Sequence, residues 1–423
     1  MGSRRDLRGP LPADGTVVVV GASLAGFRAA RGLRDEGFAG RLVLVGEERH
    51  LPYDRPPLSK QVLAGTWEVE RTRLADAGQL SDLGLQCLFG HRAVSLDADA
   101  ARVELDDGST IEADALVIAT GAHPRRLPGT EELGGVEVLR TIEDVSAIRE
   151  AIQSAGDGCR IVVIGAGFIG SEVAATCAGS GCRVTVLEAL DAPLASALGA
   201  RVGAACGRLH GLHGVTLLTG VKVTAVENGS RAGRALQVVL DDGTRLDADV
   251  VVVGIGVQPS TDWLVGSGLT IGDGVRCDAA LFAADRIVAA GDVARWTWSH
   301  LDHDEDVRIE HWEVASQMGS AVARSLVAGR ERAPHFDPVP YFWSDQYGLR
   351  IQVLGRPDPT DDIEVVDGDL ESDDGKFVAV YGRDGKLSAA LGVSRPRQLM
   401  AFRPLLEAGA TWQEGVNLLA SKS

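Results

Sequence analysis

Two segments built on the same plan restrict the fold of this 423-residue chain more than any other feature. Each is an unbroken aliphatic run that ends in a glycine-rich turn, and a segment of helical character follows each turn. The turns begin at Gly21 and Gly165. Continuous aliphatic runs are typical of buried parallel strands. The sequence therefore predicts two strand–turn–helix units within an α/β protein.

The two turns also predict two sites for dinucleotides. In such a turn the first glycine permits the tight bend, the second lets a pyrophosphate approach the backbone, and the third lets the helix pack against the strand. The pyrophosphate then binds to exposed N–H groups at the helix N-terminus. The positions concerned are Gly21, Ser23, Ala25 and Gly26 in the first copy and Gly165, Gly167, Ile169 and Gly170 in the second. Ser23 replaces the middle glycine, and its small side chain preserves the close approach.

A carboxylate ends the strand that follows each turn, and such a carboxylate binds ribose hydroxyls. The first copy has Glu47 at this place and the second has Glu188. A carboxylate repels a 2′-phosphate, and no basic residue occupies positions 188–190. The second site is therefore predicted to prefer NADH over NADPH.

The rest of the chain repeats this plan at a spacing of roughly 140 residues, which indicates a duplicated dinucleotide domain. Each copy has an Asp-Asp-Gly hairpin signal, at 106–108 and 241–243, followed by a buried strand, at 115–122 and 250–256. A further apolar strand ends at Gly291 and Asp292, and a helical segment is expected from about 314 to 329. From about residue 331 the composition changes to prolines and short alternating strands, which predicts a smaller third domain. Residues 1–15 are expected to be a mobile N-terminal tail.

Composition excludes several classes of function. The net charge of −17 argues against nucleic acid or an anionic membrane as the main partner. No apolar stretch reaches membrane-spanning length, and the N-terminus lacks the apolar core of a signal peptide. The six cysteines form no C-x-x-C pair, so free thiols, a cytoplasmic location and no protein-bound metal are expected.

Four segments carry a resemblance to a known family: residues 51–60 (LPYDRPPLSK), 165–172 (GAGFIGSE), 290–294 (AGDVA) and 342–347 (FWSDQY). With them the chain, from about 16 to 420, resembles the FAD-dependent, NADH-linked ferredoxin reductases. These enzymes serve bacterial cytochrome P450 systems and aromatic-ring dioxygenases.

The resemblance implies a glutathione reductase-like fold, with two Rossmann-like dinucleotide-binding domains and a smaller α+β C-terminal domain. Residues 16–123 and 254–330 would form a discontinuous FAD-binding domain, and residues 124–253 would bind the nicotinamide cofactor. Residues 331–423 would form the C-terminal domain, on the flavin side where the ferredoxin docks.

The resemblance also implies site residues. The positions that match FAD contacts in the family are Ala25, Glu47, Lys60, Ala93, Arg140, Asp292 and Trp312. Glu172 matches a carboxylate beside the nicotinamide. Further cofactor contacts are expected at Arg55, Thr120, Gly121, Gly256, Gly291 and Trp343.

Lys60 follows a Pro-Pro turn, and two interpretations of it remain open from the residues alone. Its ammonium could lie near flavin N5, pair with Glu172 and stabilise reduced flavin, or it could be a surface lysine that caps the next helix. Trp343 likewise could lie at the ring edge or pack in the core. Hydride transfer to flavin needs alignment and electrostatics rather than an acid–base pair, so no catalytic base is predicted. Lys60 and Glu172 are the candidate catalytic residues through their charges.

Two further patterns could suggest disulfide or metal chemistry. Cys177 and Cys182 have the C-x₄-C spacing of flavin disulfide reductases, but they lie on the second helix, over the nicotinamide domain, so no redox disulfide is expected. The pairs His210–His213 and His300–His303 are expected to lie in solvated loops rather than to bind metal.

The predicted activity is transfer of electrons from NADH through FAD to a [2Fe–2S] ferredoxin. A rubredoxin or quinone-like acceptor remains an alternative, as does a redox-sensing interaction protein like apoptosis-inducing factor. Candidate docking charges for the ferredoxin are Arg295, Arg350, Arg395 and Arg397.

Overall fold

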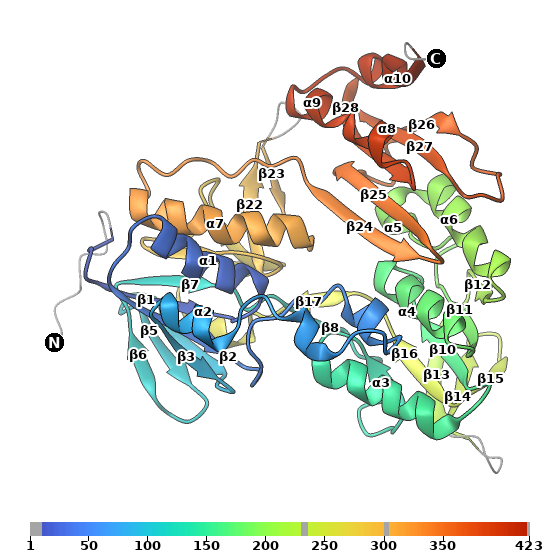
Figure 1. The fold of residues 1–423 in the computed structure, drawn as a ribbon, viewed down its shortest axis with the longest axis horizontal. Coiled ribbons are helices and arrows are strands. Elements are labelled where there is room, and N and C mark those ends of the chain that lie inside the picture. Colours follow the sequence, from blue (N-terminus) through green and yellow to red (C-terminus); the bar gives the residue numbers. More distant parts are fainter. Residues whose placement is uncertain (1–10, 230–235, 300–303, 421–423) are drawn as a thin grey trace. The chain divides into compact units, whose positions relative to one another are not determined.

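The computed structural model describes residues 11–229, 236–299 and 304–420 (Figure 1). The chain forms two compact units, and each is discontinuous in sequence. The first unit contains the residues up to Asp54, Thr72–His123 and Gln258–Pro338. The second contains Arg55–Arg71, Pro124–Val257 and the chain from Val339 onward.

The first unit is built on a six-stranded sheet in the order β20-β21-β7-β1-β2-β3. Its strands are β1 (Thr16–Val20), β2 (Arg41–Gly46), β3 (Leu85–Phe89), β7 (Ala115–Ile118), β20 (Phe282–Ala284) and β21 (Ile287–Ala289). All neighbours are parallel except β20 and β21. Helices α1 (Leu24–Asp35) and α7 (Trp312–Ala328) pack side by side in this unit (Figure 1). The predicted strands and helices of the first copy are therefore present.

Smaller elements complete the first unit. One three-stranded sheet contains β4 (Ala93–Asp97), β5 (Arg102–Leu105) and β6 (Thr110–Glu112). Another sheet contains β18 (Ile271–Gly272), β19 (Gly274–Cys277), β22 (Ala294–Trp298) and β23 (Glu305–Val307). The unit also has the short helix α2 (Ala77–Asp82) and a 3₁₀ turn at Asp262–Leu264.

The second unit repeats the arrangement with a parallel sheet in the order β12-β11-β10-β16-β9. Its strands are β9 (Val136–Val138), β10 (Arg160–Ile164), β11 (Arg183–Leu187), β12 (Thr216–Leu218) and β16 (Val250–Val253). Its helices are α3 (Ile142–Ala155), α4 (Phe168–Gly179), α5 (Ala195–Leu198) and α6 (Ala200–Leu212). The strand β10 lies between β11 and β16 just as β1 lies between β2 and β7, which confirms the predicted duplication.

Both predicted Asp-Asp-Gly hairpins are present. The first joins β5 to β6, and the second joins β14 (Leu236–Leu240) to β15 (Arg245–Ala248), with β13 (Val223–Asn228) alongside β14. The short strands β8 (Ala122–Pro124) and β17 (Val257–Pro259) pair with each other. They contain two of the five points at which the chain passes between the units.

The C-terminal residues form an antiparallel sheet within the second unit, in the order β24-β25-β28-β27-β26. The strands are β24 (Tyr341–Gln346), β25 (Leu349–Gly355), β26 (Asp362–Gly368), β27 (Phe377–Arg383) and β28 (Lys386–Val393), followed by α8 (Pro396–Met400), α9 (Arg403–Glu407) and α10 (Trp412–Ala420). One apolar core joins this sheet to two helices: it contains Val353 and Leu391 of the sheet together with Leu198 of α5 and Val202 of α6. The segment Arg55–Arg71, with a short π-helical turn at Leu58–Val62, belongs to the same unit.

Within the described ranges, we find no helix that is both long and apolar enough to cross a membrane.

Candidate functional site

The first glycine-rich turn has the geometry that a dinucleotide requires. Gly21 has a φ of +111°, and a Cβ on it would lie 2.1 Å from the carbonyl oxygen of Ala119. A Cβ on Gly26 would lie 1.8 Å from the carbonyl oxygen of Gly21. Neither position can hold a side chain, so β1 and α1 approach closely. Ser23 is the N-cap of α1 but makes no capping bond with its side chain, so the first-turn amides remain available to a phosphate.

The second turn has the same geometry and leaves more space. Gly165 has a φ of +100°, and a Cβ on Gly170 would lie 2.1 Å from the carbonyl oxygen of Gly165. A Cβ on the middle glycine, Gly167, would meet nothing within 4 Å, so the turn is open where a pyrophosphate approaches. Gly167 leaves the N-terminus of α4 without a side-chain cap, and the Oγ atom of Ser171 is buried there with no hydrogen-bond partner. Both turns therefore fit a dinucleotide.

The two strand-end carboxylates differ in how they are held. Glu188 accepts the N–H of Ala166 at 2.8 Å through Oε2 and the N–H of Leu190 at 2.9 Å through Oε1. The carboxylate is thereby fixed against the glycine-rich turn. Glu47 is exposed, and its Oε1 lies 3.9 Å from Nε of Arg92.

Other predicted FAD positions of the first unit meet at the ends of its parallel strands. A Cβ on Gly291 would lie 2.9 Å from the Cβ of Ala25, so the turn after β21 lies directly against α1. Thr120 donates its hydroxyl to the carbonyl of Ser260 at 2.9 Å, and Gly121 follows with a φ of +67°. The carbonyl of Asp292 accepts a hydrogen bond from Arg308 at 3.2 Å. Ala93 is buried at the start of β4 and takes part in none of these contacts.

Trp312 begins α7, and its indole is oriented by a carboxylate that the sequence interpretation did not single out. Its Nε1–H donates to Oδ1 of Asp54 at 2.7 Å. Burial raises the pKa of Asp54, while the Trp312 hydrogen bond and the charge of Arg28 act in the opposite direction. Asp54 lies within the 51–60 segment, so that motif was the available signal.

Glu172 is the centre of a buried polar network in the second unit. Its side chain is 3% exposed, on the first turns of α4. Oε2 accepts from Nζ of Lys60 at 2.7 Å and from the hydroxyl of Ser59 at 2.5 Å. Oε1 accepts from the hydroxyl of Ser344 at 2.6 Å. The predicted ion pair between Lys60 and Glu172 is therefore present, and Lys60 is not a surface lysine because its side chain is only 12% exposed.

Further contacts hold this network in place. Gln346 donates from Nε2 to the hydroxyl oxygen of Ser344 at 3.1 Å, and Thr176 of α4 donates to the carbonyl of Ser59 at 2.8 Å. The sequence interpretation named neither serine nor Gln346, although all three lie inside the 51–60 and 342–347 motifs. A separate bond links two predicted residues, because Arg55 donates to the carbonyl of Arg140 at 2.6 Å.

The remaining predicted positions of the second unit lie at its surface. Ile169 is 47% exposed on the first turn of α4, and Gly256 is exposed after β16, with a φ of +94°. Trp343 is half-buried on β24 and stacks against Tyr341, with ring centroids 6.1 Å apart. Part of the Trp343 side chain is therefore exposed, so Trp343 is not packed wholly within the core.

All six cysteines are free thiols. Burial raises the pKa of Cys177 and of Cys182, which disfavours the reactive thiolate. That the C-x₄-C spacing does not mark a redox disulfide stays a prediction.

The expectation that His210 lies in a solvated loop is wrong. His210 lies on α6, is 1% exposed, and its Nδ1 is 2.6 Å from the hydroxyl of Tyr347. The apolar face of α6 packs against the C-terminal sheet, which buries the imidazole. His300 and His303 lie outside the described residues. In the part of the chain that is described, no cluster of three His, Cys, Asp or Glu side chains could hold a metal.

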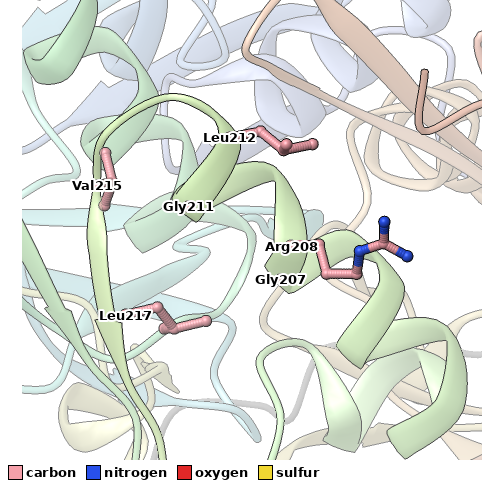
Figure 2. Close-up of a pocket in the computed structure, with 6 residues that line it drawn as sticks. All are labelled: Gly207, Arg208, Gly211, Leu212, Val215 and Leu217. Atoms are coloured by element: carbon pink, nitrogen blue, oxygen red, sulfur yellow. The ribbon is translucent and has the colours of Figure 1, made fainter. Parts of the chain in front are cut away.

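A shallow pocket of about 410 Å³ lies elsewhere in the second unit, between α6 and β12 (Figure 2). Figure 2 shows its lining residues: Gly207, Arg208, Gly211, Leu212, Val215 and Leu217. None of the predicted cofactor residues lines it, so this pocket is not part of the candidate site.

Comparison with known proteins places this geometry in a family. Residues 15–319 match the model of the pyridine nucleotide-disulphide oxidoreductases, and residues 341–417 match a reductase C-terminal domain. The chain belongs to the pyridine nucleotide-disulphide oxidoreductases. It is therefore an oxidoreductase, and all six of its cysteines are free thiols.

Proteins that are similar over most of the chain include ferredoxin reductases. The chain is 37% identical to rhodocoxin reductase of Rhodococcus erythropolis, over 92% of this chain and 89% of that protein. It is 36% identical to the ferredoxin–NAD(+) reductase subunit of the benzene 1,2-dioxygenase system of Pseudomonas putida, over 93% and 92%. A solved covalent complex of putidaredoxin reductase with putidaredoxin matches with a TM-score of 0.87 at 32% identity, over 97% of this chain and 99% of that one. The resemblance and the fold class expected from the sequence are confirmed.

Proposed function

We propose that this protein is an FAD-dependent NADH:ferredoxin oxidoreductase. It takes two electrons from NADH and delivers them singly to a [2Fe–2S] ferredoxin, which supplies a cytochrome P450 or a ring-hydroxylating dioxygenase. The overall reaction is NADH plus two oxidised ferredoxins giving NAD⁺, H⁺ and two reduced ferredoxins. The relatives named ferredoxin–NAD(+) reductase and the solved reductase–putidaredoxin complex support this assignment.

The observation that carries the proposal is the pair of uncapped helix N-termini, each behind a glycine-rich turn, in two different units. We assign FAD to the first turn and NADH to the second. The corresponding domains are 16–123 with 254–330 for FAD, 124–253 for NADH and 331–423 for the C-terminal part. Bound FAD would supply the conversion between a two-electron donor and a one-electron acceptor.

The residues of this chain would bind and orient the cofactors. Gly21, Ser23, Gly26 and Glu47 would hold the adenosine diphosphate part of FAD, and Gly165, Gly167, Gly170 and Glu188 would hold that of NADH. The Lys60–Glu172 pair would supply fixed charge at the reacting rings, where electrostatic alignment favours transfer.

Docking of the ferredoxin and location in the cell are also proposals. Three of the four candidate docking arginines are engaged within the chain: Arg295 with Asp273 at 3.3 Å, Arg350 with Asp345 at 2.6 Å, and Arg395 with Asp367 at 3.0 Å. Arg350 is exposed and the other two arginines are partly buried. Ion pairs near the surface contribute little to stability, so we propose that these arginines can exchange their partners for an acidic protein. We place the protein in the cytoplasm, where NADH is available.

Anaerobic titration tests the function. The purified protein, reconstituted with FAD, should show flavin absorbance that is bleached by one equivalent of NADH and much more slowly by NADPH. Addition of an oxidised [2Fe–2S] ferredoxin should then restore the oxidised flavin spectrum. A protein that takes up no FAD would contradict the flavin assignment. Reduction by NADH without turnover on ferredoxin would favour a rubredoxin, a quinone-like acceptor or a redox-sensing role.

A further inference from the structure

The carboxylate of Glu172 receives a hydrogen bond from a residue of the C-terminal sheet. Ser344 lies on β24, is 0% exposed, and donates its hydroxyl to Oε1 of Glu172 at 2.6 Å. Lys60 and Ser59 bind the other oxygen, Oε2. The bond from Ser344 therefore determines how the carboxylate is rotated, and hence where Oε2 meets the ammonium of Lys60.

The direction of the Ser344 hydroxyl is itself determined by a neighbour. Gln346 is 1% exposed and donates from Nε2 to the oxygen of Ser344 at 3.1 Å. Because this bond uses an acceptor site on the hydroxyl oxygen, the hydroxyl proton is left to point at Glu172. Ser344 and Gln346 lie on the same face of β24, two residues apart, as the alternation of a strand requires.

We propose that Ser344, oriented by Gln346, is a positioning residue for the Lys60–Glu172 pair, through which the C-terminal sheet sets the electrostatics of the redox centre. The inference rests on the proposed function, since it assumes that the pair acts at the flavin. Loss of the Ser344 bond frees the carboxylate to turn and leaves Oε1 without its buried donor. The ammonium of Lys60 is then held less firmly, and reduced flavin is stabilised less.

A closely matched network in the same sheet provides the control. Ser388 on β28 is 1% exposed and donates to Oδ2 of Asp361 at 2.7 Å. Oδ1 of Asp361, whose side chain is 0% exposed, accepts from Arg383 at 2.7 Å. This network also joins a buried serine, a carboxylate and a cation, and Glu172 takes part in none of these bonds. S388A therefore removes an equivalent buried bond without touching the proposed centre.

The test compares FAD-loaded wild type, S344A, Q346M and S388A. Because a hydrogen bond to a charged group is involved, we expect S344A to lower the rate constant of flavin reduction by NADH about tenfold. We also expect a flavin midpoint potential about 30 mV more negative, the two-electron equivalent of a tenfold change. Q346M should shift both quantities in the same direction by less, and S388A should leave both at the wild-type values while lowering the melting temperature.

Equal midpoint potentials in S344A and S388A would overturn the inference, because a merely structural serine predicts that result. If S344A does not fold, the flavin midpoint potentials of Q346M and S388A are compared instead. Equal values in these two variants would then overturn the inference. A wild-type protein that binds no flavin, or that NADH does not reduce, would refute the proposed function and remain distinguishable from this outcome.

Discussion

The side chain of Glu188 has two roles: it forms hydrogen bonds within the protein, and its charge is expected to select the coenzyme. Its carboxylate accepts hydrogen bonds from the main-chain N–H groups of Ala166 and Leu190. These two bonds fix the side chain against the second glycine-rich turn. The same negative charge would face the 2′ position of a bound adenosine ribose. Choice of coenzyme is therefore expected to follow the charge of this residue rather than the shape of the turn.

The substitution E188Q removes the charge but keeps an oxygen that can accept a hydrogen bond. We expect the preference for NADH over NADPH, measured as the ratio of kcat/KM values, to fall about tenfold, since about 1.4 kcal/mol of repulsion is removed. The matched variant E47Q changes the equivalent carboxylate of the first turn. It should weaken FAD binding and leave the coenzyme ratio unchanged. An unchanged ratio in E188Q would show that another residue selects the coenzyme.

In the second glycine-rich turn and in α6, neighbouring elements determine which side chains fit. The room for a side chain differs between two glycines of the turn: Gly167 faces open space, whereas Gly170 touches the backbone of Gly165. In α6, the contact with the β24–β25 turn buries His210 against Tyr347. In both elements, what a residue can tolerate depends on its neighbours in space.

Alanine substitutions should separate ligand binding from folding in the turn. G167A adds a methyl group where nothing lies within 4 Å, so the free energy of unfolding should change by less than about 0.5 kcal/mol. The same methyl group would occupy the approach of the pyrophosphate and raise the NADH dissociation constant at least about tenfold. G170A places a methyl group against a carbonyl and should destabilise the protein by about 1–3 kcal/mol. Denaturant unfolding and NADH titration of both variants check these expectations.

His210 should make the stability of the protein depend on pH. Burial, with a smaller contribution from His213, lowers its pKa from the ordinary 6.5 to about 4. As the pH falls below 6.5, the unfolded chain therefore takes up a proton that the folded chain does not, and stability is lost until the pH reaches about 4. The contribution is complete above about pH 6.5.

Between pH 7.5 and pH 5 the expected loss from His210 is about 2 kcal/mol. The variant H210N keeps an acceptor for the Tyr347 hydroxyl and cannot titrate, so its loss of unfolding free energy over this range should be smaller by that amount. H335N, which changes an exposed histidine, serves as the control. Parallel pH dependence in H210N and wild type would contradict the argument.

For the whole molecule, the boundaries of compact units do not follow the order of the chain. The C-terminal sheet belongs to the second unit, together with residues 55–71 and 124–257. One apolar core joins Leu198 and Val202 of α5 and α6 to Val353 and Leu391 of the sheet. We therefore expect the sheet and the nicotinamide block to unfold together.

A chain that ends at Pro338 tests this expectation. It lacks the sheet, and the apolar side chains of α5 and α6 would be exposed to water, which favours aggregation. We expect a poorly soluble product that binds hydrophobic dyes and lacks a cooperative melting transition for the second unit. A monomeric fragment with a sharp transition would show instead that the sheet is an independent domain.

The parts of the protein that depend on contiguous residues could be predicted from the sequence by itself. The two glycine-rich turns, their strand-end carboxylates Glu47 and Glu188, and the Asp-Asp-Gly hairpins are local patterns, because backbone sterics and strand or helix periodicity act over a few residues. The resemblance added the Lys60–Glu172 pair, whose partners are 112 residues apart.

Only the tertiary structure decided which buried polar groups meet. Ser344 reaches Glu172 across 172 positions, and Asp54 receives the indole of Trp312 across 258. His210 was expected in a loop, whereas α6 places it on a helix whose packing buries the side chain. The physical reason is the same in each case: a buried polar group must find a partner, and the fold, not the local sequence, determines which partner is within reach.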